Sequence, residues 1–547
     1  MLLEKHVLQI NIDPLTSEEL KQILITHHPQ FTTIADRMIS VFHLFSKKIS
    51  ESKEINLPKT SRLISTRDFF KWCSRATKDF DISSQTSALK VLQDAIDVFC
   101  CSFPKPEDAL NLAREISTHL GIINQKAEYF LKNYKPTIQQ TPSSLEVGRA
   151  TIPRDNERLI FRQNYYFTRP SAVLLERVMC CVNLKEPVLL VGETGTGKTS
   201  SVQFLANTIG QKLVVINMNQ QSDSADLLGG FKPVDLKFIV GAIREEFEQV
   251  FCSYFQVEPN KTFLGHVAFC YNEQRYSDLV KLMTKSYEAA VSRLMKPDAS
   301  KKHLLPQWQS IGVKLHRLNL QLRQKSALAF AFIEGSLVKA VENGYWVLLD
   351  EINLANAETL ECLSGLLEGS ESSLCLLERG DKEPVKRHPN FTLFACMNPS
   401  TDVGKKDLPA GLRNRFTEFF VDELTEKNDL LLLVSSYLDA FSLKDVELGK
   451  IVDFYLKVRK ETETTLTDGL GHKPHFSLRS LCRALMIAAR NPCGMVKKSL
   501  YEAFCLSFLT QLDSSSYILL EKMIGRYLQS KLQHFCFIFI FDNFLDI

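Results

Sequence analysis

One octapeptide constrains this chain more than any other feature: Gly192-Glu193-Thr194-Gly195-Thr196-Gly197-Lys198-Thr199. It matches the pattern GxxxxGK[ST], with an apolar run at 188–191 before it and a stretch of helical pattern at 200–209 after it. Glycines let backbone N–H groups curl around phosphate oxygens, and the N-terminus of the following helix adds positive partial charge. The sequence therefore predicts a nucleotide-phosphate site, with Lys198 on the β- and γ-phosphates and Thr199 as a Mg²⁺ ligand.

Three further short apolar runs, at 212–218, 345–350 and 391–397, alternate with segments of helical pattern. Continuous apolar runs of this length are typical of strands buried on both faces of a sheet. Their alternation with helices favours an α/β fold, with a parallel sheet flanked by helices.

Polar residues follow two of these runs: Asp350 and Glu351 at the end of one, and Asn398 after the other. The carboxyl ends of parallel strands border the ligand crevice of such a sheet. We expect Asp350 to hold Mg²⁺, Glu351 to polarise the attacking water as a base, and Asn398 to orient that water or the γ-phosphate. The alternatives are a pair of surface acids and a simple Asn-Pro turn.

Three arginines are candidates for contact with nucleotide. Arg413 and Arg415, in GLRNRF, are either a surface pair or include an arginine finger that reaches a neighbouring site in trans, with Arg415 slightly favoured. Arg479, in FSLRSLCRAL, either contacts nucleotide from a later helical region or lies on a helix surface.

The expected ligands are ATP and Mg²⁺ rather than GTP. The segment 226–229 matches the GTPase-like pattern DxxG, but only the two ends of that tetrapeptide are fixed. The guanine-reading pattern NKxD is missing from the sequence, because Asn260-Lys261 is followed by Thr262-Phe263.

The sequence pattern predicts five regions along the chain. Residues 1–135 are mostly helical, and 136–165 form a linker marked by Pro136, Pro142 and Pro153. Residues 166–423 form the α/β core, with a helical insertion at about 237–325, and 424–530 are again helical. The apolar tail 531–547 is either a buried terminal strand or an artefact of a truncated or mis-predicted transcript.

Composition excludes several classes of protein. Lys and Arg total 66 against 63 Asp and Glu, so the chain has no global basic field, and no direct reading of nucleic acid is expected. The 14 cysteines show no CxxC spacing, which argues against a disulfide scaffold or a zinc site. The sequence has no signal peptide and no apolar run of membrane-spanning length, so we expect a soluble intracellular protein without a membrane partner.

The chain resembles the AAA+ P-loop ATPases, in particular their dynein-related and MoxR-like branch. The segments that carry this resemblance are, in order, GETGTGKT, YWVLLDEINLA, CMNP and LPAGLRNRF. DLLGGFKPVD, the long helical insertion and FSLRSLCRAL resemble the midasin family of nuclear ATPases over about 165–490. The resemblance implies all-α lid domains, neighbouring AAA+ units, and removal of assembly factors from pre-60S ribosomal particles in the nucleolus and nucleoplasm. It also implies ATP hydrolysis that drives conformational work and is weak in an isolated piece.

A weak internal repeat supports this resemblance. Segment 10–24 aligns with 419–433, and Ser65 and Arg67 align with Ser477 and Arg479. Residues 1–135 are thus similar to the lid of a preceding unit, and the chain is expected to hold the end of a first AAA+ unit and all of a second.

Two rival hypotheses remain. The first is an ATP-binding structural unit that does not hydrolyse ATP, against which the intact Glu351 argues. The second is a MoxR-like chaperone or a nucleic-acid translocase. The sequence contains no nuclease or basic domain that would support the translocase. The insertion either regulates the ring of AAA+ units that the resemblance implies, or the path of its substrate, or is a solvated helical decoration.

Overall fold

The structure is a computed structural model of the 547-residue chain. It describes residues 15–51, 64–78, 80–155, 165–256, 258–295, 304–323, 328–369, 372–376, 384–399, 406–441, 443–491 and 494–528. The described residues fall into two compact units, one within residues 1–223, 340–374 and 385–547, and one within residues 224–339 and 375–384.

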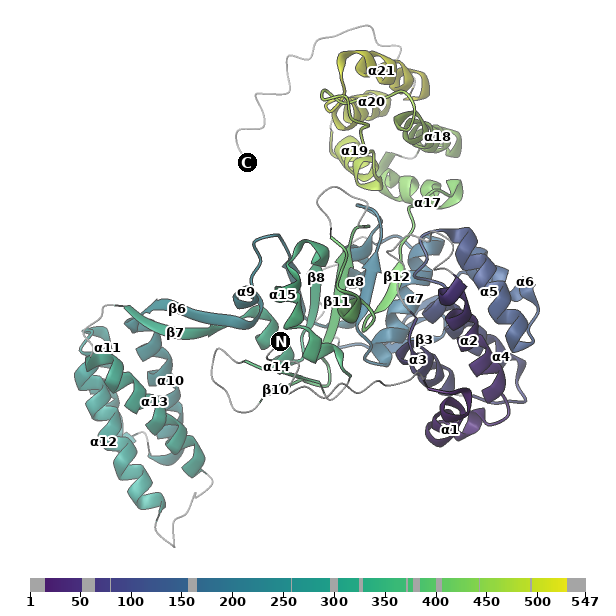
Figure 1. The fold of residues 1–547 in the computed structure, drawn as a ribbon. Helices are drawn as coiled ribbons and strands as arrows, with labels where there is room; N and C mark the ends of the chain where they lie inside the picture. The colour runs from purple at the N-terminus through teal and green to yellow at the C-terminus, as the bar shows by residue number, and fades with distance from the viewer. Residues whose placement is uncertain are drawn as a thin grey trace, which may run out of the picture. The chain divides into compact units, whose positions relative to one another are not determined.

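A five-stranded parallel sheet forms the centre of the first unit (Figure 1). Its strands lie in the order β12-β4-β11-β8-β5, and every neighbouring pair is parallel. Their bounds are β4 (Val188–Val191), β5 (Leu213–Asn217), β8 (Trp346–Asp350), β11 (Thr392–Met397) and β12 (Thr417–Phe420). The predicted parallel sheet and all four predicted strands are confirmed, whereas β12 was not predicted.

Helices and short elements surround this sheet. They are α7 (Arg169–Asn183), α8 (Lys198–Ile209), α14 (Ser336–Asn343), α15 (Ala357–Glu361) and α16 (Ala410–Arg413). Thr168 caps α7, because its side chain accepts a hydrogen bond from the Ser171 N–H. A short antiparallel pair, β9 (Ser373–Leu374) and β10 (Val385–Lys386), precedes β11 along the chain.

The described part of the N-terminal region contains six α-helices: α1 (Ser17–His27), α2 (Ala35–Glu51), α3 (Thr66–Thr77), α4 (Gln85–Phe99), α5 (Pro106–Leu120) and α6 (Asn124–Lys132). A capping box begins α1, in which the Thr16 N–H donates to Glu19 Oε2 at 2.8 Å and the Glu19 N–H donates to Thr16 Oγ1 at 3.4 Å. The predicted helical character of this region is therefore confirmed over the described residues.

The predicted linker 136–165 is wrong over most of its described part. Residues 138–153 form a three-stranded antiparallel sheet of β1 (Ile138–Gln140), β2 (Ser144–Val147) and β3 (Ala150–Pro153). Residues of β2 and β3 alternate between buried and more exposed positions, and Leu145 and Ile152 face the core. The prolines mark ends and turns of these short strands rather than an unstructured connection.

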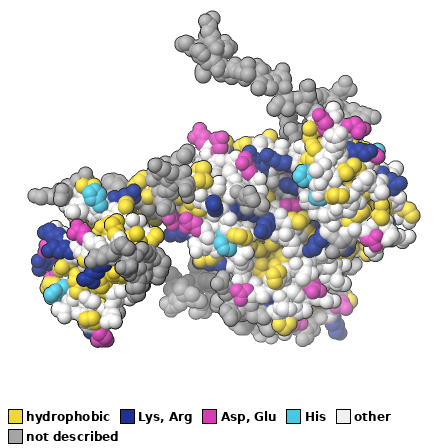
Figure 2. Space-filling view, turned by 90° about the horizontal axis from the view of Figure 1, so that it is seen from below, with side chains coloured by type: hydrophobic (Ala, Val, Ile, Leu, Met, Phe, Trp, Pro, Cys, Tyr) yellow, Lys and Arg dark blue, Asp and Glu magenta, His cyan; other side chains and the backbone are white. Residues whose placement is uncertain are grey.

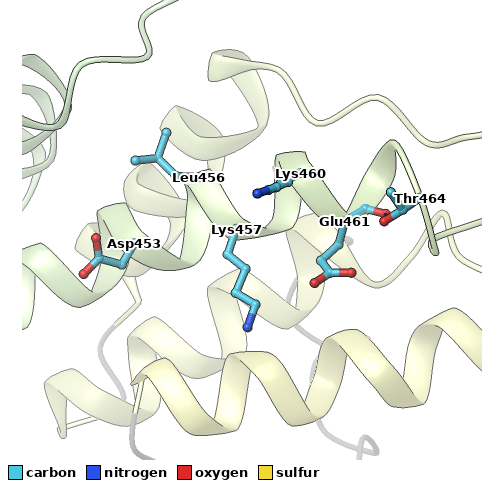
Figure 3. A pocket seen from close by; sticks show the side chains of 6 residues that line it. All are labelled: Asp453, Leu456, Lys457, Lys460, Glu461 and Thr464. Carbon is cyan, nitrogen blue, oxygen red and sulfur yellow. Dashed lines mark hydrogen bonds between the residues drawn. The ribbon is translucent and has the colours of Figure 1, made fainter.

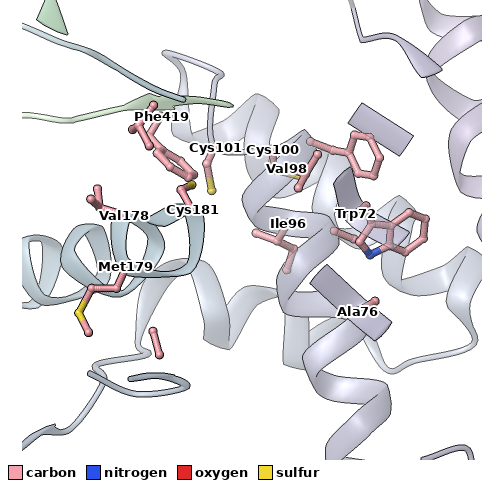
Figure 4. Close-up of a cluster of buried hydrophobic side chains, with 14 of the residues drawn as sticks. Trp72, Ala76, Ile96, Val98, Cys100, Cys101, Val178, Met179, Cys181 and Phe419 are labelled. Atoms are coloured by element: carbon pink, nitrogen blue, oxygen red, sulfur yellow. The ribbon is translucent and has the colours of Figure 1, made fainter. Parts of the chain in front are cut away.

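The N-terminal helices and the α/β core share one hydrophobic core. Trp72 of α3 and Ile96 of α4 belong to the same buried cluster as Val178 of α7 and Phe419 of β12 (Figure 4). Shared apolar burial of this kind makes the two regions one folding unit.

Buried ion pairs reinforce this junction. Arg75 of α3 donates to both carboxylate oxygens of Glu186, at 3.0 and 2.6 Å, and Thr417 of β12 donates to the same carboxylate at 2.7 Å. Asp97 of α4 accepts a 2.7 Å hydrogen bond from Arg177 of α7 and is also paired with Arg149. Charged groups buried in this way are tolerated because they are mutually paired.

The C-terminal helices have a hydrophobic core of their own. They are α17 (Lys427–Tyr437), α18 (Asp445–Thr462), α19 (Leu478–Arg490), α20 (Val496–Phe508) and α21 (Ser514–Leu528), with Phe454, Phe504 and Phe508 at the centre. A pocket is lined by five residues of α18 and by Thr464, which follows that helix, and none of the lining residues belongs to the octapeptide 192–199 (Figure 3). The predicted tail 531–547 lies outside the described residues.

The insertion is a unit by itself. It contains α9 (Ser224–Leu228) and an antiparallel ribbon of β6 (Gly229–Asp235) and β7 (Leu328–Glu334). The ribbon carries four helices: α10 (Leu236–Tyr254), α11 (Lys261–Asn272), α12 (Tyr276–Leu294) and α13 (Leu305–Arg323) (Figure 1). Phe247, Phe251, Met283 and Trp308 lie in its core.

The insertion was predicted as helical, which α10–α13 confirm, but the ribbon was not predicted. Its surface, at the left of Figure 2, shows hydrophobic side chains interspersed with Lys and Arg. None of the described helices in the chain is both long and apolar enough to cross a membrane.

Candidate functional site

The octapeptide 192–199, the predicted phosphate loop, connects the end of β4 to the start of α8. Gly195 and Gly197 have φ values of +89° and +87°, a region that favours glycine. A Cβ at Gly192 would lie 2.3 Å from the carbonyl oxygen of Val421, so that close approach also requires glycine. The side chain of Lys198 folds over the loop, where its Nζ donates to the carbonyl oxygens of Gly192 at 2.6 Å and Glu193 at 2.7 Å.

Lys198 is a buried cation. Burial lowers its pKa, and the nearby charge of Arg479 acts in the same direction, while Cys396, Asp350 and Glu193 oppose the shift. A buried ammonium group of this kind gains most from an anion placed beside it.

Thr199 and Asp350 lie together at the carboxyl end of the sheet. Thr199 Oγ1 donates to Asp350 Oδ2 at 3.0 Å, and the Met218 N–H donates to the backbone carbonyl of Asp350 at 2.9 Å. A hydroxyl and a carboxylate are the hard oxygen ligands that Mg²⁺ prefers. The predicted pair therefore fits a Mg²⁺ site in both chemistry and placement.

Glu351 has a left-handed backbone conformation, with φ +54° and ψ +42°. Its N–H donates to Asp350 Oδ1 at 3.1 Å, and its carbonyl accepts from the Leu354 N–H at 3.0 Å. A non-glycine residue in this conformation is strained, and such strain is concentrated at functional sites. The turn re-aims the chain directly after β8, at the edge of the sheet where the phosphate loop lies.

Asn398 connects the loop to the end of β11. Its Oδ1 accepts from Lys198 Nζ at 3.3 Å, and its Nδ2 donates to Thr194 Oγ1 at 3.2 Å. The two segments meet because β4 and β11 are neighbours and Met397 pairs with Val191. The structure thus brings together Lys198, Thr199, Asp350, Glu351 and Asn398 at one edge of the sheet.

Both finger candidates are engaged within this chain. Arg413 makes two hydrogen bonds to Glu418, at 2.8 and 2.7 Å, and 13% of its side chain and 1% of the Glu418 side chain are exposed. Arg415 donates to the Ser364 carbonyl at 2.6 Å and lies 3.3 Å from the exposed carboxylate of Glu368. The Arg415 pair is easier to separate, because an exposed ion pair contributes little to stability.

The backbone of Arg479 lies beside the phosphate loop. A Cβ at Gly195 would meet the Arg479 nitrogen at 3.1 Å and Ser477 Oγ at 3.3 Å. Because Ser477 and Arg479 begin α19, the N-terminal end of that helix adjoins the loop. No described hydrogen bond or ion pair assigns a partner to the Arg479 guanidinium.

Sequence reasoning missed two residues near this site. Asn353, with 1% of its surface exposed, donates from Nδ2 to the Asn398 carbonyl at 3.1 Å. Tyr165 stacks on Phe204 of α8, with ring centroids 4.3 Å apart, and its hydroxyl lies 2.9 Å from Ser201 Oγ. Asn353 is close in sequence to Glu351, which was a usable signal, whereas no local pattern marks Tyr165.

Comparison with protein families identifies three regions. Residues 187–269 and 316–416 match the model described as AAA domain (dynein-related subfamily). Residues 19–123 and 429–531 each match a model described as Midasin AAA lid domain. The gap in the AAA match, 270–315, falls within the helical insertion.

Comparison with curated proteins finds two midasins. The chain is 33% identical to midasin of Dictyostelium discoideum over 95% of this chain and 10% of that protein. It is 29% identical to midasin of Giardia intestinalis over 84% of this chain and 11% of that protein. An uncharacterised protein of Staphylococcus haemolyticus is 28% identical over 31% of this chain and 59% of its own length. The chain thus spans about a tenth of the length of the midasins that it matches.

Proposed function

The chain belongs to the midasin family of AAA proteins, and from this premise we propose that it holds one ATP-hydrolysing AAA+ unit preceded by the lid of another. In this proposal the two units are the first and the second of the longer protein. The observation that carries the proposal is the convergence of Lys198, Thr199, Asp350, Glu351 and Asn398 at one edge of the parallel sheet.

The proposed site binds the triphosphate through the loop. Lys198 exchanges its loop carbonyl partners for phosphate oxygens, which relieves the cost of its burial. Thr199 and Asp350 would hold Mg²⁺, which neutralises charge that develops on the phosphates. Tyr165 stacks on Phe204 of α8, the helix that follows this loop. Its ring is proposed to offer an apolar surface to the adenine ring of ATP.

Hydrolysis is proposed to depend on two polar groups. Glu351 accepts a proton from the attacking water, and Asn398 orients that water or the γ-phosphate from the neighbouring strand. The left-handed turn at Glu351 and the hydrogen bonds of Asn398 support these roles, because both hold the groups at the strand ends before ATP binds. Arg415, supplied to a neighbouring site, is the favoured finger.

Motion is proposed to occur between the α/β core and helices α17–α21. The two regions have separate hydrophobic cores. Few polar contacts connect them among the described residues; examples are the Arg459–Glu423 ion pair and the Arg169 N–H, which donates to Asp429 Oδ1 at 3.0 Å. The α19 terminus beside Gly195 would sense the contents of the loop and change its angle to the core.

Neighbouring AAA units are the proposed partners. On α3, Lys71 donates to the Arg415 carbonyl at 3.1 Å and Arg75 pairs with Glu186, so this helix face is buried against the α/β core. The repeat register places Arg483 and Ile487 of α19 at the corresponding positions. Nearby Met486 is 42% exposed. This face of α19 is suited to the core of the following unit.

From the resemblance to the midasin family, we propose that the longer protein remodels pre-60S ribosomal particles by removing assembly factors in the nucleolus and nucleoplasm. The experiment that tests the proposed chemistry measures ATP binding and ATP turnover by the intact chain. A non-hydrolysing ATP-binding unit is the second candidate. It is favoured by the internal ion pairs of Arg413 and Arg415, which leave neither guanidinium free for a neighbour.

A further inference from the structure

Asn353 is a buried polar residue next to the proposed base. It lies in the single helical turn Ile352–Leu354, directly after Glu351. Its Nδ2 donates to the backbone carbonyl of Asn398 at 3.1 Å. The Asn353 side chain therefore joins the turn after β8 to the residue after β11.

This link begins where the backbone ladder stops. The pairing of β8 with β11 ends where Leu349 lies opposite Ala395. Glu351 and Asn398, the two groups proposed to act on water, both lie beyond that last pair. Ladder hydrogen bonds hold two strands in register. Beyond the last pair, the hydrogen bond from the Asn353 amide to the Asn398 carbonyl connects the two chain segments.

The link continues to the phosphate loop. The Asn398 side chain accepts from Lys198 at 3.3 Å and donates to Thr194 at 3.2 Å. At the other end, the turn that carries Asn353 is closed by the hydrogen bond from Leu354 to Glu351. One connected set of hydrogen bonds therefore runs from the Glu351 turn to the loop.

The acceptor of Asn353 points to a role other than stability. Its Oδ1 is buried and has no hydrogen-bond partner among the residues that the structure describes. A buried unpaired acceptor destabilises the folded state, so an apolar residue would suit this position better if packing alone mattered.

We propose that Asn353 is a positioning residue for ATP hydrolysis. Its amide fixes the Asn398 carbonyl and thereby the orientation of Asn398 relative to Glu351, so that both address the same water. The inference rests on the proposed function. Because Lys198 and Thr199 make no hydrogen bond to Asn353 among those described, loss of the link lowers turnover and leaves ATP binding largely intact.

The test compares Asn353→Asp with wild type in the intact chain. The change preserves shape but replaces the Nδ2 donor with a carboxylate oxygen facing the Asn398 carbonyl. Turnover at saturating ATP is expected to fall by roughly 10–100-fold, while the Kd for ATP changes less than about threefold. Asn356→Asp is the matched control, since Asn356 is exposed, its side chain makes no capping hydrogen bond at the start of α15, and Asp keeps the oxygen that accepts from Lys406.

Hydrogen exchange tests the link without turnover. The amides of Met397 and Asn398 are expected to exchange about tenfold faster in Asn353→Asp than in wild type or the control. Unchanged exchange, or a loss of affinity equal to the loss of turnover, overturns the proposal. If wild type binds ATP without turnover, the proposed hydrolysis fails and the role of Asn353 in it fails as well, while exchange still decides whether the Asn353 amide holds Asn398 in place. Asn353→Ser replaces Asn353→Asp in both measurements if the latter does not fold.

Discussion

Thr199 and Asp350 are 151 residues apart in sequence, and Thr199 Oγ1 donates to Asp350 Oδ2 at 3.0 Å. They meet because β4, which leads into the loop, and β8, which ends at Asp350, flank the same central strand β11. The parallel sheet thus converts two distant sequence segments into one pair of oxygen ligands. This pair links nucleotide binding to Mg²⁺ in the proposed mechanism.

Removal of either oxygen should make nucleotide binding insensitive to Mg²⁺. We expect Thr199→Ala and Asp350→Asn each to weaken ATP binding in Mg²⁺ by about tenfold, or roughly 1.4 kcal/mol. In EDTA the variants and wild type should bind alike. Fluorescence titration with a labelled ATP in both buffers measures this. Thr208→Ala, on the same helix, is the control, and an equal loss in EDTA would show that these oxygens act only through the fold.

Lys198 is expected to lower the free energy of unfolding although ATP binding requires it. Its pKa is lowered by burial, so at neutral pH its charged form destabilises the folded state. Lys198→Met is expected to abolish ATP binding and to raise the free energy of unfolding by about 1 kcal/mol at pH 7. Because the neutral form is favoured in the fold, wild type should gain on the variant as pH rises toward the ordinary lysine pKa of about 10.4. Urea melts at pH 7 and pH 9.5 measure both effects, and a less stable variant at pH 7 would contradict the argument.

Substitution of Arg413 should mainly lower stability, whereas substitution of Arg415 should mainly lower ATP turnover at the site of a neighbouring chain. Arg413→Ala leaves the buried Glu418 carboxylate unpaired and should cost about 3 kcal/mol of stability. Arg415→Ala should cost less than about 1 kcal/mol, because its ionic partner Glu368 is exposed. If Arg415 is the finger, its loss lowers assisted turnover by ~10³-fold or more. In a mixture of Arg415→Ala chains with Glu351→Gln chains, the second chain supplies Arg415 to the intact site of the first, so turnover should return. Full turnover by Arg415→Ala alone would exclude that role.

Two buried acids of α4 should respond differently to neutralisation. Burial opposes ionisation of Asp97, but Arg149 and Arg177 outweigh it and lower its pKa. Burial raises the pKa of Asp94 despite Arg149 and Arg75. At pH 7, Asp97→Asn should therefore lower the free energy of unfolding by about 3 kcal/mol, and Asp94→Asn by less than about 1 kcal/mol.

The pH dependence of this pair has a definite sign. A lowered folded-state pKa gives stability above the unfolded value, near 3.9, that is lost as pH falls through the folded value. The deficit of Asp97→Asn should thus shrink below pH 4, whereas a raised pKa makes ionised Asp94 a burden above that range. Denaturant melts at pH 7 and pH 3.5 test this, and equal deficits for both variants would contradict the assignment.

Local patterns were enough to predict the sheet and the segments that border the proposed site. The glycines, Lys198 and the apolar runs act within a few residues of themselves, so the four strands and the glycine-rich turn between β4 and α8 were predicted correctly. The ends of those strands then led to Asp350, Glu351 and Asn398 as candidates, because parallel strands present their carboxyl ends at one edge.

Tertiary contacts explain what was missed. The sheet at 138–153 is stabilised by burial of Leu145 and Ile152. Its strands are too short for their alternation of apolar and polar residues to stand out, and the three prolines indicated a linker instead. The partner of Asn353 is a backbone carbonyl 45 residues away, which no spacing reveals. The Arg75–Glu186 pair, 111 residues apart, likewise exists only once α3 packs on the core.

The most direct test of ATP hydrolysis at this site is turnover per chain measured over a range of protein concentrations, with wild type and Glu351→Gln side by side. Bound ATP is measured in the same samples. We predict that wild type binds ATP and hydrolyses it with a rate per chain that rises with concentration, as a trans finger requires, while Glu351→Gln binds ATP and does not hydrolyse it. Equal turnover by wild type and Glu351→Gln, or ATP binding by wild type with no turnover at any concentration, would contradict it.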